Sequence, residues 1–197
     1  APTAEQDGKP LVILAARMIW PKGILAFVEA ARELRKQGVA ARFALVGEPD
    51  PGNPESISLH QLKEWDREGA VECWGARTDM PAVYQGAHVV CLPSYYGEGV
   101  PRALIEAAAS ARAIVATDIP GCREIVQDTV NGFLVSPNDS QGLTEALGML
   151  LNDPLLRKRM GSASRAIFEA GFEEEQVIGD TVAVYDRLLT KTFDELS

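Results

Sequence analysis

Segment 93–124 places two glutamates and a glycine-rich loop between an apolar run and a helical pattern. The loop reads Gly97-Glu98-Gly99-Val100-Pro101, and Glu106 follows within ALIEAAA. Glycines ahead of a helix let backbone N–H groups approach an anion, and the helix dipole adds partial positive charge there. Pro101 suits a first helical position, where its missing N–H is not needed. The segment therefore predicts a phosphate-binding loop.

The two glutamates in this segment predict different contacts. A carboxylate inside a phosphate-binding loop would repel its ligand, so Glu98 is expected to accept from a sugar hydroxyl or to pair with Arg17 or Lys22. An ordinary solvent-facing loop glutamate is the alternative. Glu106 lies among small apolar residues, where an unpaired carboxylate is costly. Two ribose hydroxyls would satisfy both its oxygens, and a water-facing position on the helix is the equally weighted alternative.

Two cations follow the first apolar run of the chain. Arg17 and Lys22 lie five residues apart on one loop. An arginine can bind a diphosphate bidentately, while a lysine supplies a point charge. The pair is typical of a diphosphate site, and the alternative is a solvated surface loop.

Aromatic, histidine and cysteine residues give weaker signals. Aromatic side chains that could stack on a base, or form the wall of a pocket, are Trp74, Tyr95 and Tyr96. Neither histidine has ligand spacing with another His or Cys, so we expect no metal site. The three cysteines are widely spaced and form no CxxC motif, which favours a reduced, cytoplasmic setting.

Composition limits the class of protein. The chain has 197 residues, 46% of them hydrophobic, and a net charge of −9, so its bulk charge gives no indication of a nucleic-acid-binding surface. No run of 18 apolar residues is present to span a bilayer. We interpret residues 1–9 as a linker or the edge of an expressed segment, and 10–197 as one domain.

Short apolar runs alternate with helical patterns along the chain. We expect strands at 11–16, 43–46, 71–74, 87–92, 113–117 and 133–135. We expect helices from Ile24 to a stop at Gly38, and at 58–68, 79–85, 101–111, 139–151, 154–169 and 173–193. The alternation predicts an α/β fold, a Rossmann-like doubly wound parallel sheet with C-terminal helices. Ligands bind such sheets at the carboxyl ends of the strands, where the loops of Arg17, Gly47, Gly75, 94–100 and 118–121 would meet.

The sequence GEGVPRALIEAAASARAIVATDIPGCREIV, followed by NGFLV, resembles the donor-binding half of a retaining glycosyltransferase of the GT-B class. More closely, it is similar to the family 4 transferases and their E-x7-E motif, here Glu98 to Glu106. The segment LVILAARMIWPKG is similar to an early G-R…K-G element of that family, with Ala16 where glycine is usual. The resemblance extends over residues 10–195.

The resemblance implies a role for each matching position. Arg17, Lys22 and the backbone at Gly99 and Val100 would hold the diphosphate of a nucleotide sugar, and Glu106 would hold the ribose. The base would lie against Gly75 and Arg77, and the sugar against Tyr96 and Gly97. Glu98 would be the catalytic residue, facing the transferring carbon. The donor would be UDP-linked, carrying a hexose or N-acetylhexosamine, without cofactor or metal.

The resemblance also implies a partner domain. GT-B enzymes bind the acceptor, here a glycan or a lipid-linked glycan, mainly through an N-terminal domain that this chain lacks. We therefore expect a C-terminal piece that transfers nothing alone, from a cytoplasmic protein that could meet the inner face of the membrane through its other half. Two alternatives remain open: an enzyme like the UDP-sugar 2-epimerases, and a non-catalytic module that binds a nucleotide or a glycan.

Overall fold

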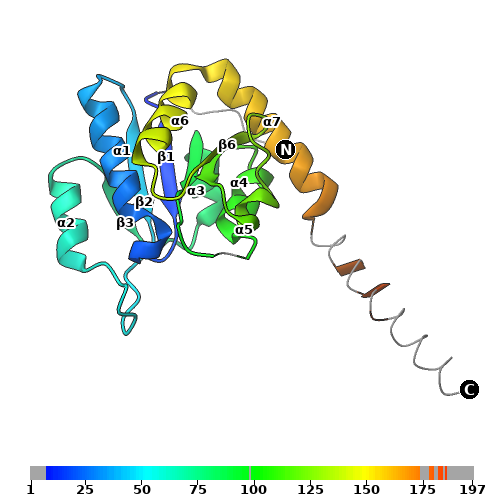
Figure 1. The fold of residues 1–197 in the computed structure, drawn as a ribbon, viewed down its shortest axis with the longest axis horizontal. Coiled ribbons are helices and arrows are strands. Elements are labelled where there is room, and N and C mark those ends of the chain that lie inside the picture. Colours follow the sequence, from blue (N-terminus) through cyan, green and yellow to red (C-terminus); the bar gives the residue numbers. More distant parts are fainter. Residues whose placement is uncertain (1–7, 98, 174–177, 180–181, 184, 186–197) are drawn as a thin grey trace, which may run out of the picture.

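Six short apolar segments form one parallel sheet in the computed structural model (Figure 1), which describes residues 8–97, 99–173, 178–179, 182–183 and 185. The strands are β1 Leu11–Ala15, β2 Arg42–Val46, β3 Glu72–Gly75, β4 Val89–Leu92, β5 Ala113–Thr117 and β6 Gly132–Val135. Their order across the sheet is β3-β2-β1-β4-β5-β6. The expected doubly wound sheet is confirmed.

The central strands are apolar because both faces of the sheet are covered. In β1, Val12 and Leu14 pack into one apolar cluster, whereas Leu11, Ile13 and Ala15 pack into another. Successive side chains of a strand point to opposite faces, so one uninterrupted apolar run serves both clusters. This is why the strands appear in the sequence as uninterrupted apolar runs and not as alternating apolar and polar residues.

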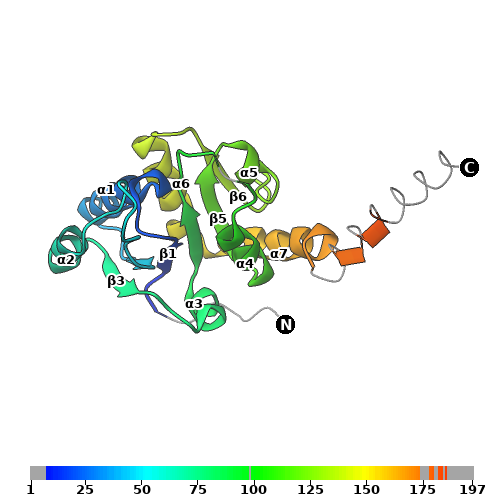
Figure 2. The ribbon, with the colours of Figure 1, turned by 90° about the horizontal axis from the view of Figure 1, so that it is seen from below.

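Two groups of helices cover the two faces of the sheet. One cluster holds residues of α1 Ile24–Lys36, α2 Leu59–Arg67 and α6 Ser140–Asn152. The other holds residues of α3 Met80–Gly86, α4 Arg102–Ala109 and the short α5 Pro120–Arg123. The last described helix, α7 Pro154–Gly171, packs on α4 and then runs away from the sheet (Figures 1 and 2). None of the helices within the described residues is long and apolar enough to cross a bilayer.

Several details differ from the sequence-based expectations. Pro101 is the N-cap of α4, with an extended ψ of 122°, and is not its first helical residue. The helix expected to begin at Asp79 begins at Met80, and the Asp79 carboxylate does not cap it, because Arg77 holds that carboxylate. A 3-10 turn, η1 Trp20–Lys22, lies in the loop after β1. The helix expected at 173–193 falls largely on residues that the structure does not describe.

Two glycines allow backbones to meet at the carboxyl edge of the sheet. A Cβ on Gly47 would lie 1.9 Å from the carbonyl oxygen of Ala16, and a Cβ on Gly23 would lie 2.0 Å from that of Pro93. Both distances are far below contact, so only glycine fits at these positions. The loop after β1 is thereby packed between the ends of β2 and β4.

Replacing Gly23 with alanine should destabilise the protein more than the same change at Gly38. Both glycines have positive φ, 73° and 80°, but a Cβ on Gly38 would meet nothing within 4 Å. We expect Gly38→Ala to cost about 1–2 kcal/mol of unfolding free energy. Gly23→Ala should cost about 1–3 kcal/mol more because of the clash with Pro93. Urea denaturation of both variants measures the difference, and equal losses would contradict the close packing.

Candidate functional site

A cleft of about 440 Å³ opens at the carboxyl ends of β1, β2 and β3. The start of α4 closes its far side through Arg102 and Ala103. Its lining includes Ala15, Ala16, Arg17, Val46, Gly47, Glu48, Pro49, Asp50, Ala76, Arg77, Met80, Tyr84 and Glu106. The structure thus brings together three residues that the sequence singled out, from three separate loops or helices: Arg17, Arg77 and Glu106.

Backbone hydrogen bonds fix the floor of this cleft. The Ala16 N–H donates to the Val46 carbonyl at 3.0 Å, and the Gly47 N–H donates to the Gly75 carbonyl at 2.8 Å. Gly75 has a positive φ of 66° and ends β3, directly before the cleft residue Ala76. These bonds hold the three strand ends in register, so the loops that follow them leave the sheet from fixed points.

Both arginines that the sequence predicted for this cleft are paired with carboxylates. Arg17 donates to Asp50 at 2.6 Å, with side chains 64% and 29% exposed. Arg77 donates bidentately to Asp79 at 2.8 and 2.7 Å, and this contact lowers the pKa of the Asp79 carboxyl. The cleft therefore compensates its own positive charge with acidic side chains that spacing alone did not reveal.

The carboxylate of Glu106 faces this cleft from α4. Its side chain is 40% exposed, and Arg102, one helical turn earlier, lies 3.8 Å away. On the inner side lies Tyr84 of α3, whose pKa is raised by burial and by the nearby Glu106 carboxylate. Two polar neighbours of Glu106, Arg102 and Tyr84, were thus missed from the sequence. A cation one turn before a carboxylate was the available signal for Arg102.

The expected phosphate-binding segment lies beside the cleft. The Tyr95 N–H and the Ser94 hydroxyl both donate to the Pro21 carbonyl, at 3.1 and 3.0 Å. These bonds place η1, and with it Lys22, against the loop that follows β4. Tyr96, Gly97, Gly99 and Val100 are exposed in this loop and lie outside the lining of the cleft. Glu98 is not among the described residues, so its expected role stays a prediction.

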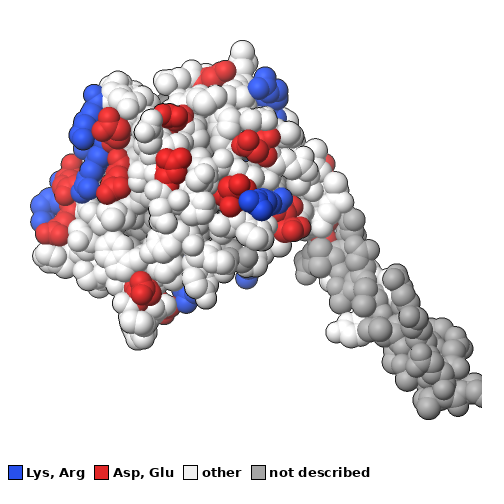
Figure 3. All heavy atoms as spheres, viewed as in Figure 1, with Lys and Arg blue, Asp and Glu red and all other residues white. Residues whose placement is uncertain are grey.

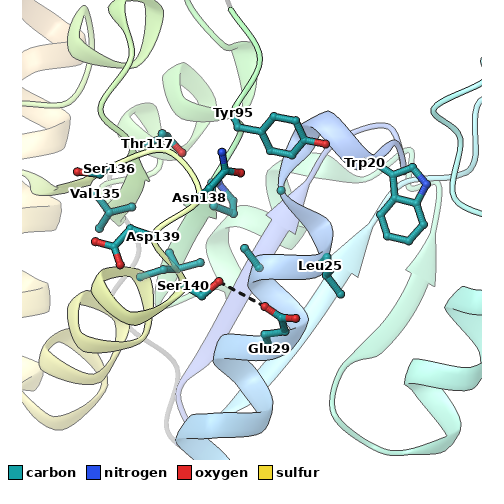
Figure 4. Close-up of a pocket in the computed structure, with 14 residues that line it drawn as sticks. Trp20, Leu25, Glu29, Tyr95, Thr117, Val135, Ser136, Asn138, Asp139 and Ser140 are labelled. Atoms are coloured by element: carbon teal, nitrogen blue, oxygen red, sulfur yellow. Dashed lines mark hydrogen bonds between the residues drawn. The ribbon is translucent and has the colours of Figure 1, made fainter.

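A second hollow, of about 290 Å³, lies on the other side of the loop after β1 (Figure 4). It is bounded by α1, by the start of α6 and by the ends of β4, β5 and β6. Two of its polar groups satisfy each other, since the Ser140 hydroxyl donates to Glu29 at 3.3 Å. Asp139 caps α6 by accepting from the Gly142 N–H. No pattern in the sequence indicated this hollow.

Charge is distributed without a broad basic surface on the face seen in Figure 3. Basic side chains there gather mainly over α1 and α2, where acidic side chains are interspersed with them. Ion pairs such as Arg32 with Glu68 account for part of this pattern. Within the described residues, no group of three or more His, Cys, Asp or Glu is arranged to hold a metal ion.

Known proteins resemble this chain in sequence and in fold. A family model described as "Glycosyl transferases group 1" matches residues 9–153. The N,N'-diacetylbacillosaminyl-diphospho-undecaprenol alpha-1,3-N-acetylgalactosaminyltransferase of Campylobacter jejuni is 35% identical over 184 residues, covering 93% of this chain and 46% of the relative. The alpha-D-kanosaminyltransferase of Streptomyces kanamyceticus is 28% identical over 155 residues, covering 78% and 39%.

Solved structures agree with these relatives. The crystal structure of Anabaena HepE in complex with UDP superposes with a TM-score of 0.78 at 26% identity, covering 89% of this chain and 49% of that one. The chain spans less than half the length of each of these three proteins. Its sheet corresponds to a Rossmann-like part of a GT-B enzyme. The chain belongs to the group 1 glycosyltransferases, of the family 4 type.

Proposed function

We propose that this chain is the donor-binding part of a retaining hexosyltransferase, which takes a hexose or N-acetylhexosamine from a UDP-linked donor and gives it to a glycan or lipid-linked acceptor. The observation that carries the proposal is the cleft that gathers Arg17, Arg77 and Glu106 at the start of α4. Its position at the carboxyl ends of parallel strands is where doubly wound folds bind nucleotides. The UDP complex of HepE, a structural neighbour, supports the choice of nucleotide.

Each part of the donor finds a matching group in this arrangement. Arg17, Lys22 and the backbone at Gly99 and Val100 would hold the diphosphate, together with the positive end of α4. Glu106 would accept from two ribose hydroxyls. Gly75 and Arg77 would face the base, and Tyr96, Gly97 and the catalytic candidate Glu98 would face the sugar.

The chemistry of transfer explains why cations are needed here. The bond between the sugar carbon and a diphosphate oxygen breaks, and the departing diphosphate takes the electron pair. Donors fixed in advance around that developing charge stabilise the transition state. Arg17, which lines the cleft together with the start of α4, and Lys22, in the η1 turn that packs on the loop after β4, would supply such groups.

The isolated chain should bind UDP, and two substitutions should separate the contributions of diphosphate and ribose. Arg17→Gln should weaken UDP by about 10-fold because it removes a charge-assisted contact, and it should weaken UMP less. Glu106→Gln should weaken both nucleotides to a similar degree. Titration calorimetry with UDP, UMP, GDP and ADP measures these effects and the preference for a base.

The matched control is Arg32→Gln, which also removes an arginine from an ion pair, but on α1 outside the cleft. It should leave UDP affinity unchanged. A folded chain that binds none of the nucleotides would sink the donor-site assignment.

The ion pair with Asp50 should oppose donor binding. A diphosphate that takes the Arg17 guanidinium must displace the Asp50 carboxylate, and it also meets that negative charge in the cleft. Asp50→Asn should therefore raise UDP affinity by about 2- to 5-fold, the size expected for an exposed ion pair. The gain should shrink at high salt. Glu68→Gln, which releases Arg32 outside the cleft, serves as the control; unchanged or weaker UDP binding by Asp50→Asn would argue against Arg17 as a diphosphate ligand.

A further inference from the structure

Tyr84 carries an unpaired polar atom into the inner wall of the cleft. The residue is 2% exposed, and its hydroxyl makes no hydrogen bond within the described part of the chain. It lies on α3 and lines the cleft together with Glu106 of α4. A buried hydroxyl without a partner is costly, so the position calls for an explanation beyond packing.

The buried phenol O–H of Tyr84 needs a hydrogen-bond acceptor, and the Glu106 carboxylate is an acceptor nearby. Besides burial, the carboxylate raises the pKa of the phenol through its charge and through a loose contact with the hydroxyl, but that contact falls short of the geometry of a well-formed hydrogen bond. A neutral phenol is a donor and a carboxylate only accepts. A small rotation of the half-exposed Glu106 side chain would join them.

Direct contact between Tyr84 and a ligand does not fit the geometry. The hydroxyl atom has almost no accessible area, because the cleft residues in front of it cover it. Glu106, which interacts with the phenol, lines the same cleft with a side chain that is 40% exposed and so can reach a ligand. Any effect of the hydroxyl on a bound nucleotide must therefore pass through the Glu106 carboxylate.

We propose that Tyr84 is a positioning residue for ribose recognition: its hydroxyl donates to one Glu106 oxygen when a nucleotide binds and so orients the carboxylate toward the two ribose hydroxyls. The inference rests on the proposed function of the cleft. Glutamate has several rotatable bonds, and ordering such a side chain on binding reduces affinity. Arg102 attracts the same carboxylate from the solvent side, at 3.8 Å. A hydrogen bond from the Tyr84 hydroxyl on the buried side would oppose the attraction of the carboxylate to Arg102.

The test is a double-mutant cycle with two nucleotides. Tyr84→Phe keeps the ring and removes only the hydroxyl. It should lower the affinity of the chain for UDP by about 5-fold, the size of one modest hydrogen bond. The affinity for 2′-deoxy-UDP should fall less, so the preference for ribose should decrease. In a Glu106→Gln background, Tyr84→Phe should produce a smaller further loss. Calorimetry of the four proteins with both nucleotides gives these ratios.

A structural role alone would give another result. Because the hydroxyl is unpaired in the free chain, Tyr84→Phe should leave the urea midpoint unchanged or raise it. The control is Val83→Ala, a buried neighbour on α3 that does not line the cleft; it should lower the midpoint and keep the ribose preference. If the wild type binds UDP and Tyr84→Phe changes neither affinity nor preference, this inference is overturned alone. If the wild type binds no nucleotide, the proposed function falls with it.

Discussion

The position of β1 between β2 and β4 is the constraint on which the rest of the molecule depends. Every side chain of β1 is buried, alternately against the helices of one face and of the other. The helix after β1 packs on one face and the helix after β4 packs on the opposite face, so their connecting loops diverge. A cleft must open where neighbouring loops part, and here it opens beside the start of α4. The location of the site thus follows from strand order.

Charge compensation follows from this arrangement. A cleft suited to an anion concentrates cations, and without a ligand those cations would repel one another. Asp50 and Asp79 neutralise Arg17 and Arg77 through contacts of 2.6 to 2.8 Å. In the proposed function, binding of a diphosphate would exchange one anionic partner of the arginine for another, and the net gain in free energy would be smaller than the gross attraction. The same exchange would disfavour weaker anions, since each would have to compete with a carboxylate already in place.

The sequence predicted the sheet well because strands buried on both faces read as apolar runs. Six strands could be inferred from those runs, and the meeting of the loops of Arg17, Gly47 and Gly75 from the rule that such loops share one edge. The roles of Arg77 and Glu106 came from the family resemblance. The lack of a side-chain cap from Asp79 could not be inferred, because local pattern does not reveal that Arg77 holds its carboxylate. Sequence spacing also did not indicate that Asp50 forms an ion pair with Arg17, which lies 33 residues earlier in the chain.

Tyr84 illustrates the same limit for a single atom. Its place among apolar residues predicts a core aromatic, and its ring is buried as that pattern requires. Whether its hydroxyl has a partner depends on how α3 meets α4, which is a matter of tertiary packing. A polar atom without a hydrogen-bond partner can be recognised only when the positions of all its neighbours are known. Such an atom indicates that something besides packing accounts for the residue at that position.

The loop after β1 lies between the cleft and the second hollow and contributes residues to both. Ala16 and Arg17 line the cleft, while Trp20 and Gly23 line the hollow. Between them the chain is held by backbone bonds: the Met18 N–H donates to the Glu48 carbonyl, and the Trp20 N–H donates to the Glu55 carbonyl, both at 2.9 Å. These bonds also tie down the 49–56 segment that carries Asp50. These bonds favour a fixed wall over a lid, so in the proposed function the side chains of Arg17 and Asp50 would exchange partners while the backbone keeps its hydrogen bonds.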